Sequence, residues 1–569
     1  MSIQPSDAET AHRKVMPFQK YKPFPKIDLK DRTWPDQEIK TAPKWCSVDL
    51  RDGNQALIEP MSPEEKQRLY DLLVDVGFKE IEVGFPAASQ TDFDFVRKII
   101  DEDLIPSDVT IQVLCQAREE LIKRTCEAVA GAPRVIFHLY NSTSTLQRRV
   151  VFGMSQEEII KLATDATEIV KANTRELVAS GTEVVLEYSP ESFTATEMDF
   201  AVDICAAVMA VWAPTGDEKV ILNLPSTVEM ATPNIYADQI EYFIKRLPNR
   251  DQAIISLHTH NDRGTGVAAS ELGLMAGAER IEGTLFGNGE RTGNCDVITM
   301  AMNLFSQGVD PELYLSDMPR IVEVSESCTK IPIHVRQPYA GDLVFTAFSG
   351  SHQDAIRKGM AYVESGSDGA WEVPYLPIDP ADVGGSYRET VRVNSQSGKG
   401  GVAFILENYF GVHLPRELLV ELSPIIQRVS EQDGGELKAD MIWSTFVSEM
   451  VEVPGPYQLL SYEVKSTGAD RETCQAVIKI SESEMQISGE GSGPIDAFVA
   501  ALSQSINEAL NVVDYQEYAM NEGSNAKAIS IIALSDGEGQ KHFGVGISAN
   551  TTTASFNSII AALNRKWRQ

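Results

Sequence analysis

Eight short apolar segments, rich in β-branched residues, recur between residues 45 and 285 and alternate with amphipathic segments of helical periodicity. Strands alternating with helices in this number predict an α/β fold whose parallel sheet closes into a (β/α)8 (TIM) barrel. A doubly wound open sheet gives the same alternation, but no expected strand is followed by the G-x-G-x-x-G turn of that architecture. Polar residues also gather at the C-terminal ends of many strands, where the active sites of barrels lie. The expected strands are 45–50, 80–85, 110–114, 134–139, 183–188, 220–224, 253–257 and 280–285.

Three further parts of different character surround the expected barrel. The N-terminal segment is rich in Pro, Lys and aromatic residues and has no clear period, which indicates an extended arm packed on the body. The region after the barrel is mixed and helical, as expected for linker subdomains. The expected domains are the arm at 1–44, the barrel at 45–305, the helical linker at 306–434 and an α+β domain at 435–569.

The last domain contains an internal duplication. Each half is a succession of three strands and a helix, with a glycine-containing turn before the helix. Neither half has a nucleophile or a metal-ligand cluster, so we expect the domain to bind a ligand or to mediate association. The strands are expected at 457–465, 475–480, 485–489, 512–520, 526–534 and 542–547, and the helices at 494–507 and 551–566.

Charge and cysteine content argue against several classes of protein. The formal net charge of −32 disfavours a nucleic-acid partner, because an acidic surface repels a polyanion. The seven cysteines are scattered with no C-x-x-C pair, which indicates reduced thiols in an intracellular protein. No apolar stretch approaches the roughly 20 residues that a membrane-spanning helix needs. Since the N-terminus resembles neither a secretory signal nor a transit peptide, we expect a cytoplasmic protein with no membrane partner.

Polar motifs follow strands one, seven and eight of the expected barrel, and barrel closure brings these strands side by side. His258 and His260 face the same side, because side chains on a strand alternate. With Asp52 and Asn294 they offer two nitrogens and two oxygens to one divalent cation. The open positions would suit the carboxylate and ketone oxygens of a 2-oxo acid, whose ketone the metal would polarise. Taken singly the motifs are ambiguous, since Arg-Asp-Gly is a common turn and the two histidines could simply be hydrogen-bonded.

As a set, the motifs resemble those of the α-isopropylmalate and homocitrate synthase family. LRDGNQ at 50–55, with Lys66 on the next helix, resembles the family's first signature, LHTHNDRGTGVA its second and FGNGERTGN its eighth-strand loop. Outside the barrel, KYKPFPKIDLKDRTWP, NSQSGKGGVA and GSGPIDA resemble the long form of the α-isopropylmalate synthases. The resemblance extends over nearly the whole chain.

The resemblance implies a Claisen-type condensation of acetyl-CoA with a 2-oxo acid, with 2-oxoisovalerate favoured, followed by hydrolysis of the thioester. The products would be 2-isopropylmalate and CoA, in the first committed step of leucine biosynthesis, under feedback inhibition by leucine. The enzyme would be an acyltransferase and a homodimer. It would need a divalent metal, Mg²⁺ in the first place, although Mn²⁺ and Zn²⁺ also suit the ligand set.

The resemblance also implies roles for individual residues. The metal ligands would be Asp52, His258, His260 and Asn294. Arg51 would bind substrate and stabilise charge that develops on the ketone oxygen, and the other substrate-binding residues would be His138, Thr227 and Glu290. The further catalytic residues would be Glu187 and, acting in the partner subunit's active site, His352 and Tyr387. The leucine-binding residues, at a helix N-terminus that favours a carboxylate, would be Gly491, Gly493, Ile495 and Ala497.

Other interpretations stay open at this point. Homocitrate and citramalate synthases share the barrel motifs and differ in the 2-oxo acid that they take. Lyases of the same superfamily carry a cysteine in the glycine-rich loop, and residues 283–294 contain none. A leucine sensor with an inactive barrel is a further alternative, although no expected ligand is missing. From the residues alone, Glu187 and His138 could be structural groups inside the rim. His352 could equally be a helix-start residue and Tyr387 an ordinary buried aromatic, so the group that removes the methyl proton is not identified.

Overall fold

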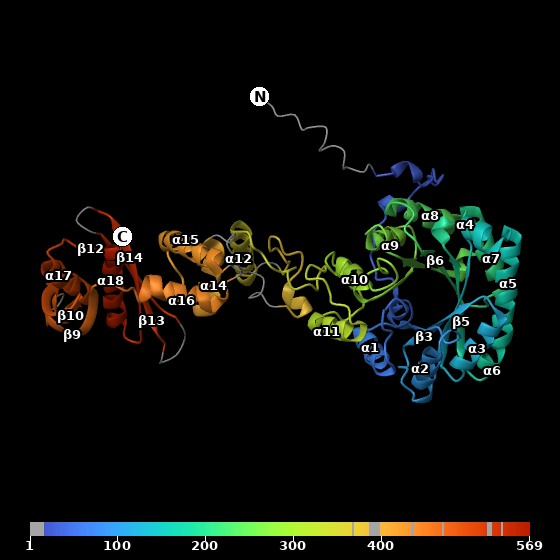
Figure 1. The fold of residues 1–569 in the computed structure, drawn as a ribbon, viewed down its shortest axis with the longest axis horizontal. Coiled ribbons are helices and arrows are strands. Elements are labelled where there is room, and N and C mark those ends of the chain that lie inside the picture. The colour runs from blue at the N-terminus through green and yellow to red at the C-terminus, as the bar shows by residue number, and fades with distance from the viewer. Residues whose placement is uncertain are drawn as a thin grey trace, which may run out of the picture. The chain divides into compact units, whose positions relative to one another are not determined.

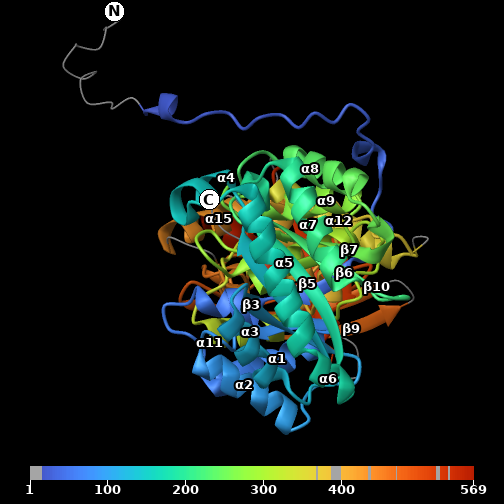
Figure 2. The same ribbon diagram turned by 90° about the vertical axis from the view of Figure 1, so that its right-hand side faces the viewer.

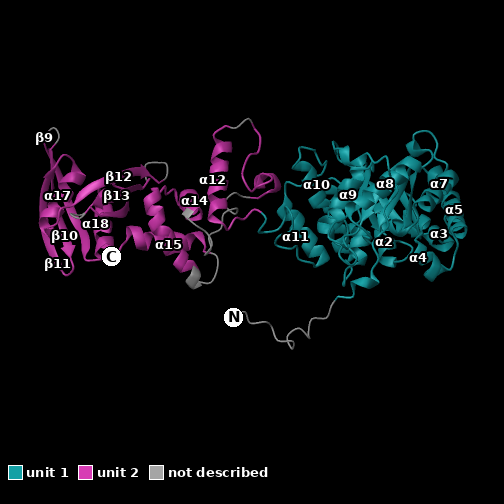
Figure 3. Ribbon diagram, turned by 90° about the horizontal axis from the view of Figure 1, so that it is seen from above, with its two compact units in different colours: residues 1–344 teal, residues 345–569 magenta. Residues whose placement is uncertain are grey.

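The structure is a computed structural model that describes residues 16–366, 369–385, 399–433, 437–468, 471–520, 526–535 and 539–568. The chain forms two compact units, residues 1–344 and residues 345–569 (Figure 3). The division falls inside the expected linker region. The finer division into arm, barrel, linker and C-terminal domain stays a prediction.

Unit 1 contains a closed barrel of eight parallel strands, which confirms the predicted fold class (Figures 1 and 2). Neighbouring strands pair in sequence order, and the first pairs with the eighth to close the sheet. The strands are β1 (Lys44–Ser47), β2 (Glu80–Gly84), β3 (Thr110–Gln116), β4 (Arg134–Ser142), β5 (Glu183–Glu191), β6 (Val220–Ser226), β7 (Ala253–Thr259) and β8 (Arg280–Gly283). Strands β1 and β8 end earlier than expected, because the chain enters the helical turns η4 (Asp49–Gly53) and η8 (Leu285–Gly287).

Helices between successive strands form the outer layer of the barrel (Figure 1). They are α1 (Pro63–Val76), α2 (Gln90–Asp101), α3 (Glu119–Val129), α4 (Thr145–Gln147), α5 (Gln156–Asn173), α6 (Arg175–Ala179), α7 (Met198–Trp212), α8 (Pro233–Arg246), α9 (Gly266–Met275) and α10 (Val297–Phe305). Local sequence explains where they begin and end. At α1, Ser62 and Glu65 form a reciprocal capping box, and Gly77 closes the helix with a φ of 105°.

The inside of the barrel is polar. Arg280 on β8 is fully buried and donates hydrogen bonds to Glu80 on β2, Gln112 on β3 and Ser256 on β7. These residues alternate along their strands with apolar ones, so one face of each strand carries the polar groups. A network of charges and amides therefore fills the barrel beneath its C-terminal rim.

The second half of the N-terminal arm contacts the barrel. Arg32 pairs with both carboxylate oxygens of Asp238 on α8 at 2.6 and 2.5 Å, and the Trp34 indole donates to the same carboxylate at 2.8 Å. Trp34 is buried, whereas Phe18 and Tyr21 are 67% and 70% exposed. The expectation of an arm packed on the body is therefore correct for its second half, whereas the described residues 16–21 lie away from the barrel (Figure 2).

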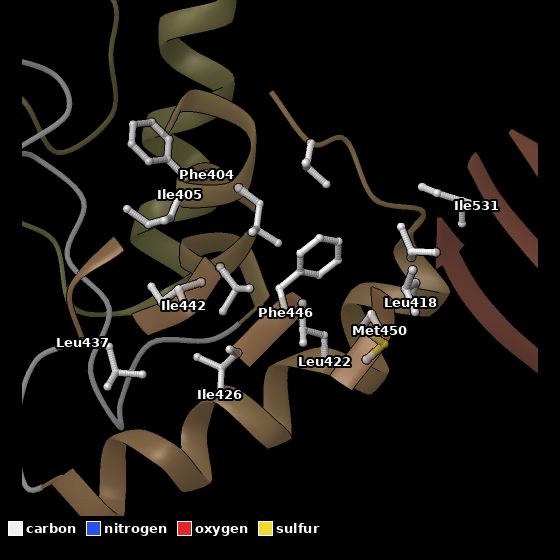
Figure 4. Packing of buried hydrophobic residues seen from close by; sticks show 14 of the residues in the cluster. Phe404, Ile405, Leu418, Leu422, Ile426, Leu437, Ile442, Phe446, Met450 and Ile531 are labelled. Atoms are coloured by element: carbon white, nitrogen blue, oxygen red, sulfur yellow. The ribbon is translucent and has the colours of Figure 1, made fainter. Parts of the chain in front are cut away.

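Helices of the predicted linker region pack around one apolar core in unit 2 (Figure 4). Leu418, Ile442 and Phe446 are fully buried in this core, which also includes Ile531 from a strand of the C-terminal sheet. The helices of the linker region are α12 (Gly350–Glu364), α14 (Lys399–Phe410) and α15 (Arg416–Asp433) in unit 2 and α11 (Met318–Thr329) in unit 1. The core also includes α16 (Ala439–Phe446), which was expected in the C-terminal domain. Within the described ranges, no helix is both long and apolar enough to cross a bilayer.

The end of unit 2 confirms the duplication predicted from the sequence. Each half is an antiparallel three-stranded sheet with one helix packed on it. The first half comprises β9 (Tyr457–Gly468), β10 (Arg471–Ile480), β11 (Ser483–Gly491) and α17 (Pro494–Ile506). The second comprises β12 (Asn511–Ala519), β13 (Ala528–Ser535), β14 (Lys541–Ser548) and α18 (Thr551–Arg568).

Glycines on the third strand of each half show that the packing is duplicated as well. A Cβ atom at Gly491 of β11 would lie 2.4 Å from the backbone nitrogen of Ala497 in α17. A Cβ atom at Gly546 of β14 would lie 1.9 Å from the carbonyl oxygen of Ala554 in α18. Only glycine lets each strand approach its helix backbone so closely.

Candidate metal centre and active-site cavity

The helical turn η4, directly after β1, places Asp52 at the rim of the barrel. This residue is 3% exposed, and its two carboxylate oxygens have different partners. Oδ1 accepts hydrogen bonds from Arg51 at 2.7 Å and from Gln55 at 3.0 Å. Oδ2 lies 3.2 Å from Nε2 of His258 and 3.8 Å from Nε2 of His260. One carboxylate oxygen and two imidazole nitrogens thus converge on one point.

The two histidines come from the end of β7, and their ring centroids lie 5.2 Å apart. Nδ1 of His258 donates to Glu282 on β8 at 2.8 Å, so Nε2 is the nitrogen directed at Asp52. Nδ1 of His260 is buried and has no hydrogen-bond partner among the described residues. The alternation argument from the sequence therefore placed both rings correctly on one side of the strand.

Asn294 lies beside His260, to which it is joined by an isolated antiparallel bridge. Its Nδ2 donates to the carbonyl of Asn288 at 3.1 Å, whereas its Oδ1 is buried and unpaired within the described part of the chain. Such a group costs free energy unless a donor or a cation satisfies it. Asn294 lines a neighbouring hollow of about 540 Å³ rather than the main cavity, so its place among the ligands stays a prediction.

The electrostatics of this cluster suit a cation. Burial alone would raise the pKa of Asp52, but the charges of Arg51 and His258 hold it well below its ordinary value. Burial would lower the pKa of His258, but its bonds to Asp52 and Glu282 raise it to about 9. Burial and the charge of His258 lower the pKa of His260 to about 4. A metal that binds both imidazoles must therefore displace a proton from His258 at neutral pH.

A cavity of about 280 Å³ opens at this cluster on the C-terminal side of the barrel. Arg51 faces it and is held by Glu82, to which its Nε donates at 2.5 Å. Four of the lining residues are apolar or aromatic, namely Phe85, Leu114, Tyr140 and Pro225. The other lining residues are Asp52, Gln55, His138, Ser189, Glu191, Asn223, Thr227, His258, His260, Glu290 and Arg291. The cavity thus combines charged and apolar surfaces, as a small organic acid requires.

Three family models match successive parts of the chain. One described as HMGL-like matches residues 42–324, one described as alpha-isopropylmalate synthase, post-catalytic domain-like, matches residues 342–407, and one described as LeuA allosteric (dimerisation) domain matches residues 436–567. The 2-isopropylmalate synthase of Rhodospirillum rubrum is 54% identical over 552 residues, which cover 97% of this chain and 99% of that protein. The chain belongs to the 2-isopropylmalate synthase family. It is therefore an enzyme of the acyltransferase type.

Further members of the 2-isopropylmalate synthase family agree. The proteins of Parafrankia sp. and Clostridium acetobutylicum are 53% and 52% identical, cover 97% of this chain and match over 98% and 99% of their own length. Among solved structures, an HMG-CoA lyase of Bacillus subtilis is 18% identical, with a TM-score of 0.41, and covers 52% of this chain and 95% of its own. An HMG-CoA lyase of Acinetobacter baumannii, in complex with coenzyme A and 3-methylmalate, is 18% identical, with a TM-score of 0.40. The match covers 51% of this chain and 92% of that one.

Seven of the nine site residues that were predicted in the barrel meet in one place in this member of the 2-isopropylmalate synthase family. The HMGL-like match and the buried cluster of Asp52, His258 and His260 together indicate a divalent-metal site. The expected substrate-binding residues Arg51, His138, Thr227 and Glu290 all line the cavity at this cluster. Their individual roles stay predictions.

Glu187 is the expected catalytic residue of strand β5, but it does not line the cavity. It is fully buried inside the barrel, where Arg280 lies 3.4 Å from one carboxylate oxygen and His138 3.4 Å from the other. Burial and the neighbouring carboxylate of Glu282 raise its pKa well above the ordinary value. The lining carboxylate of this strand is Glu191, four residues later on the same face.

The remaining predicted residues lie in unit 2. His352 is the third residue of α12 and stacks on Tyr375, with ring centroids 3.9 Å apart, while Tyr387 lies outside the described residues. The expected leucine-binding residues lie where the chain passes from β11 into α17, and Gly493 is the N-cap residue of that helix. The acid–base roles and leucine binding stay predictions.

The residues near the site that the sequence analysis missed include Ser189, Glu191 and Glu282. Ser189 lies 2.7 Å from Nε2 of His138, and Glu191 accepts a hydrogen bond from the Ser142 hydroxyl. The alternation of polar and apolar residues in β5 and β8 was the available signal, since residues two or four apart on a strand share a face.

Proposed function

We propose that this chain condenses acetyl-CoA with 2-oxoisovalerate and hydrolyses the thioester to release 2-isopropylmalate and CoA. The observation that carries the proposal is the presence of Arg51, the cluster of Asp52, His258 and His260, and an apolar wall in one cavity. A 2-oxo acid offers two oxygens to a metal and a negative charge to arginine, and its alkyl group needs an apolar surface. The family membership supports the same reaction.

Each part of the cavity has a place in this reaction. A divalent cation, proposed to be Mg²⁺ and held by Asp52, His258, His260 and Asn294, would supply Lewis-acid polarisation of the ketone. Arg51 is fixed by hydrogen bonds and offers positive charge where the ketone oxygen becomes an alkoxide. The apolar lining residues that suit the isopropyl group are Leu114, Tyr140 and Pro225.

Removal of the methyl proton of acetyl-CoA needs a base in the cavity. Glu191 is the strand-five carboxylate that lines it, so we assign this role to Glu191 rather than to Glu187. His352 and Tyr387 stay candidates for acid–base steps in the active site of a partner subunit. The homodimer that this requires is part of the proposal, supported by the match to a dimerisation domain.

We further propose that leucine binds the duplicated domain and inhibits the enzyme. The LeuA allosteric domain model matches residues 436–567, which include the turn before α17 with Gly491, Gly493, Ile495 and Ala497. The N-terminus of that helix suits a carboxylate. A cytoplasmic location, as expected from the sequence, completes the proposal.

The test is release of CoA thiol from acetyl-CoA with 2-oxoisovalerate, pyruvate or 2-oxoglutarate, each with Mg²⁺, Mn²⁺ or Zn²⁺ and with or without leucine. Release chiefly with 2-oxoisovalerate and its suppression by leucine are the expected results. Preference for another oxo acid would keep the chemistry and change the substrate. Absence of release with every pair, or an undiminished rate in His260→Ala, would refute the proposed active site.

A further inference from the structure

Glu282 on β8 lies beneath the metal cluster and accepts four hydrogen bonds, two on each carboxylate oxygen. Oε1 accepts from Gln112 at 2.8 Å and from Arg280 at 2.9 Å. Oε2 accepts from Asn223 at 3.0 Å and from Nδ1 of His258 at 2.8 Å. The residue is 1% exposed, so these four donors replace water entirely.

The donors around Glu282 are themselves fixed by other bonds. The carbonyl oxygen of the Gln112 amide accepts from Arg280 at 2.7 Å, which leaves its NH₂ group for Glu282. The NH₂ group of Asn223 also donates to Ser189 at 3.1 Å. Each of these four partners presents an N–H, and an ionised carboxylate accepts from all of them, whereas another neighbour, Glu187, is itself a carboxyl group.

His258 is the one donor of the four that also belongs to the metal cluster. As long as its Nδ1 carries a hydrogen directed at Glu282, the coordinating lone pair of the neutral ring is on Nε2. Nε2 is also the atom that faces Asp52, at 3.2 Å. A carboxylate behind a ligating histidine fixes its tautomer and orientation and increases its basicity.

We propose that Glu282 is a positioning residue of the metal centre, which holds His258 in the ring orientation and tautomer that bind the cation and thereby sets the affinity for metal. Glu282 does not line the cavity and has no direct role in the chemistry. The inference rests on the proposed ligand role of His258. It adds that the polar interior of the barrel determines the properties of the rim.

The most direct test is Glu282→Gln in the full-length chain, with Mn²⁺ affinity measured by calorimetry. Glutamine has nearly the same shape, but its NH₂ group must face two donors. His258 can relieve this conflict by accepting at Nδ1 and moving its hydrogen to Nε2, which blocks coordination. We expect Mn²⁺ affinity to fall about 10- to 100-fold. The ¹⁵N resonances of His258 in the metal-free protein, recorded at a pH at which the ring is neutral, should report the exchanged tautomer.

Glu80→Gln is the matched control, because Glu80 also accepts from Arg280 but makes no contact with His258. It should leave Mn²⁺ affinity unchanged. Glu282→Asp serves if the glutamine variant fails to fold, since it keeps the charge on a shorter side chain. Its expected result is an unchanged tautomer with a smaller loss of affinity.

Wild-type affinity in both Glu282 variants, or an equal loss in Glu80→Gln, would overturn the inference. So would a wild-type protein that binds no Mn²⁺. If the wild type binds Mn²⁺ but releases no CoA with any oxo acid, the proposed function fails while an affinity loss confined to Glu282 variants still supports the positioning role.

Discussion

Glu187 and Glu191 lie four residues apart on the same strand, yet their surroundings give them opposite properties. Glu187 is fully buried among Arg280, His138 and Glu282, and burial together with the Glu282 carboxylate raises its pKa well above the ordinary value. Glu191 is partly exposed in the cavity. The sequence LEYSPE offers both carboxylates, and only the depth of each residue along the strand distinguishes them.

This difference predicts opposite outcomes for two identical substitutions. Glu191→Gln removes the proposed base and should lower the rate of thiol release about 100- to 10,000-fold while metal affinity is kept. Glu187→Gln changes a fully buried side chain that does not line the cavity, and should leave the rate almost unchanged. Steady-state kinetics of the two variants side by side would decide the assignment, and the reverse order of effects would restore Glu187 as the catalytic residue.

A second buried carboxyl links stability to pH. Asp49 accepts hydrogen bonds from the Ser47 hydroxyl and from the Leu285 amide. Burial raises its pKa from 3.8 to about 7. The folded state therefore binds more protons than the unfolded chain between these pH values, and the stability from Asp49 is full below pH 3.8 and lost as pH rises to about 7.

The corresponding experiment is denaturant unfolding of the wild type and Asp49→Asn across pH 5 to 8. Asparagine keeps an acceptor for Leu285 and cannot ionise. A shift of this size is worth about 4 kcal/mol, so the variant should become more stable than the wild type by up to that amount as pH increases. Parallel pH curves for the two proteins would show that Asp49 does not titrate in this range.

The convergence of Asp52, His258 and His260 was predictable, because it follows from two general rules: strands alternate their faces, and parallel barrels gather their C-terminal ends. The contact between Glu282 and His258 could not be predicted from the sequence. It depends on which inward residues of two strands stand at the same height, and that stagger is a property of the closed sheet rather than of either strand.

At the scale of elements, the close approach of β11 to α17 depends on Gly491. A Cβ atom there would lie 2.4 Å from the Ala497 nitrogen and 2.6 Å from the backbone carbon of Asp496, and neither atom can move without shifting the helix. At Gly493, two residues later, a Cβ atom would meet nothing within 4 Å. The two positions form a natural pair for separating packing from ligand binding.

Gly491→Ala should therefore destabilise unit 2 by about 1–3 kcal/mol through overpacking, whereas Gly493→Ala should unfold like the wild type. Thermal unfolding measures both. Leucine inhibition in the same variants then separates two effects, because loss of inhibition in the stable Gly493→Ala protein reports on the proposed binding turn itself. Equal stability of both variants would mean that the strand and helix separate more easily than their spacing indicates.

The strands of the barrel and of the duplicated domain were well predicted as elements. Segments such as RIEG in β8 and EIEVG in β2 already show polar residues in alternation. Their composition indicated strands, but not that the charged face would point into the barrel. The polar interior is possible because Arg280 and Gln112 pair with carboxylates from several strands at once.

At the scale of the whole molecule, the division at residue 344 predicts which fragments fold. Residues 1–344 contain the complete barrel and should unfold cooperatively and bind Mn²⁺. A fragment ending at residue 433 retains Leu418 and Leu422 but lacks their partners Ile442 and Phe446. It should expose apolar surface, bind the dye ANS and aggregate, and it should not respond to leucine.

Size-exclusion chromatography and ANS fluorescence of the two fragments test this expectation. The full-length chain is the control. A fragment 1–433 that is monodisperse and silent towards ANS would show that α14 and α15 form a stable body without the C-terminal sheet. The sequence analysis placed a domain boundary between residues 434 and 435, but the apolar core of unit 2 includes residues from both sides of that point.

Strand β13 carries the side chains of two cores on its two faces. Ile531 belongs to the core that includes Ile356 of α12, and Ile532 belongs to the core that includes Phe556 of α18. The backbone of β13 is thus shared by the two cores. A displacement of this strand towards one core must be accommodated by repacking of the other. An effector that displaces the sheet would therefore also change the packing of α12, the helix that bears His352. By thermodynamic reciprocity, if an effector bound to the sheet alters the affinity of a ligand that fixes that helix, that ligand alters the affinity for the effector by the same factor.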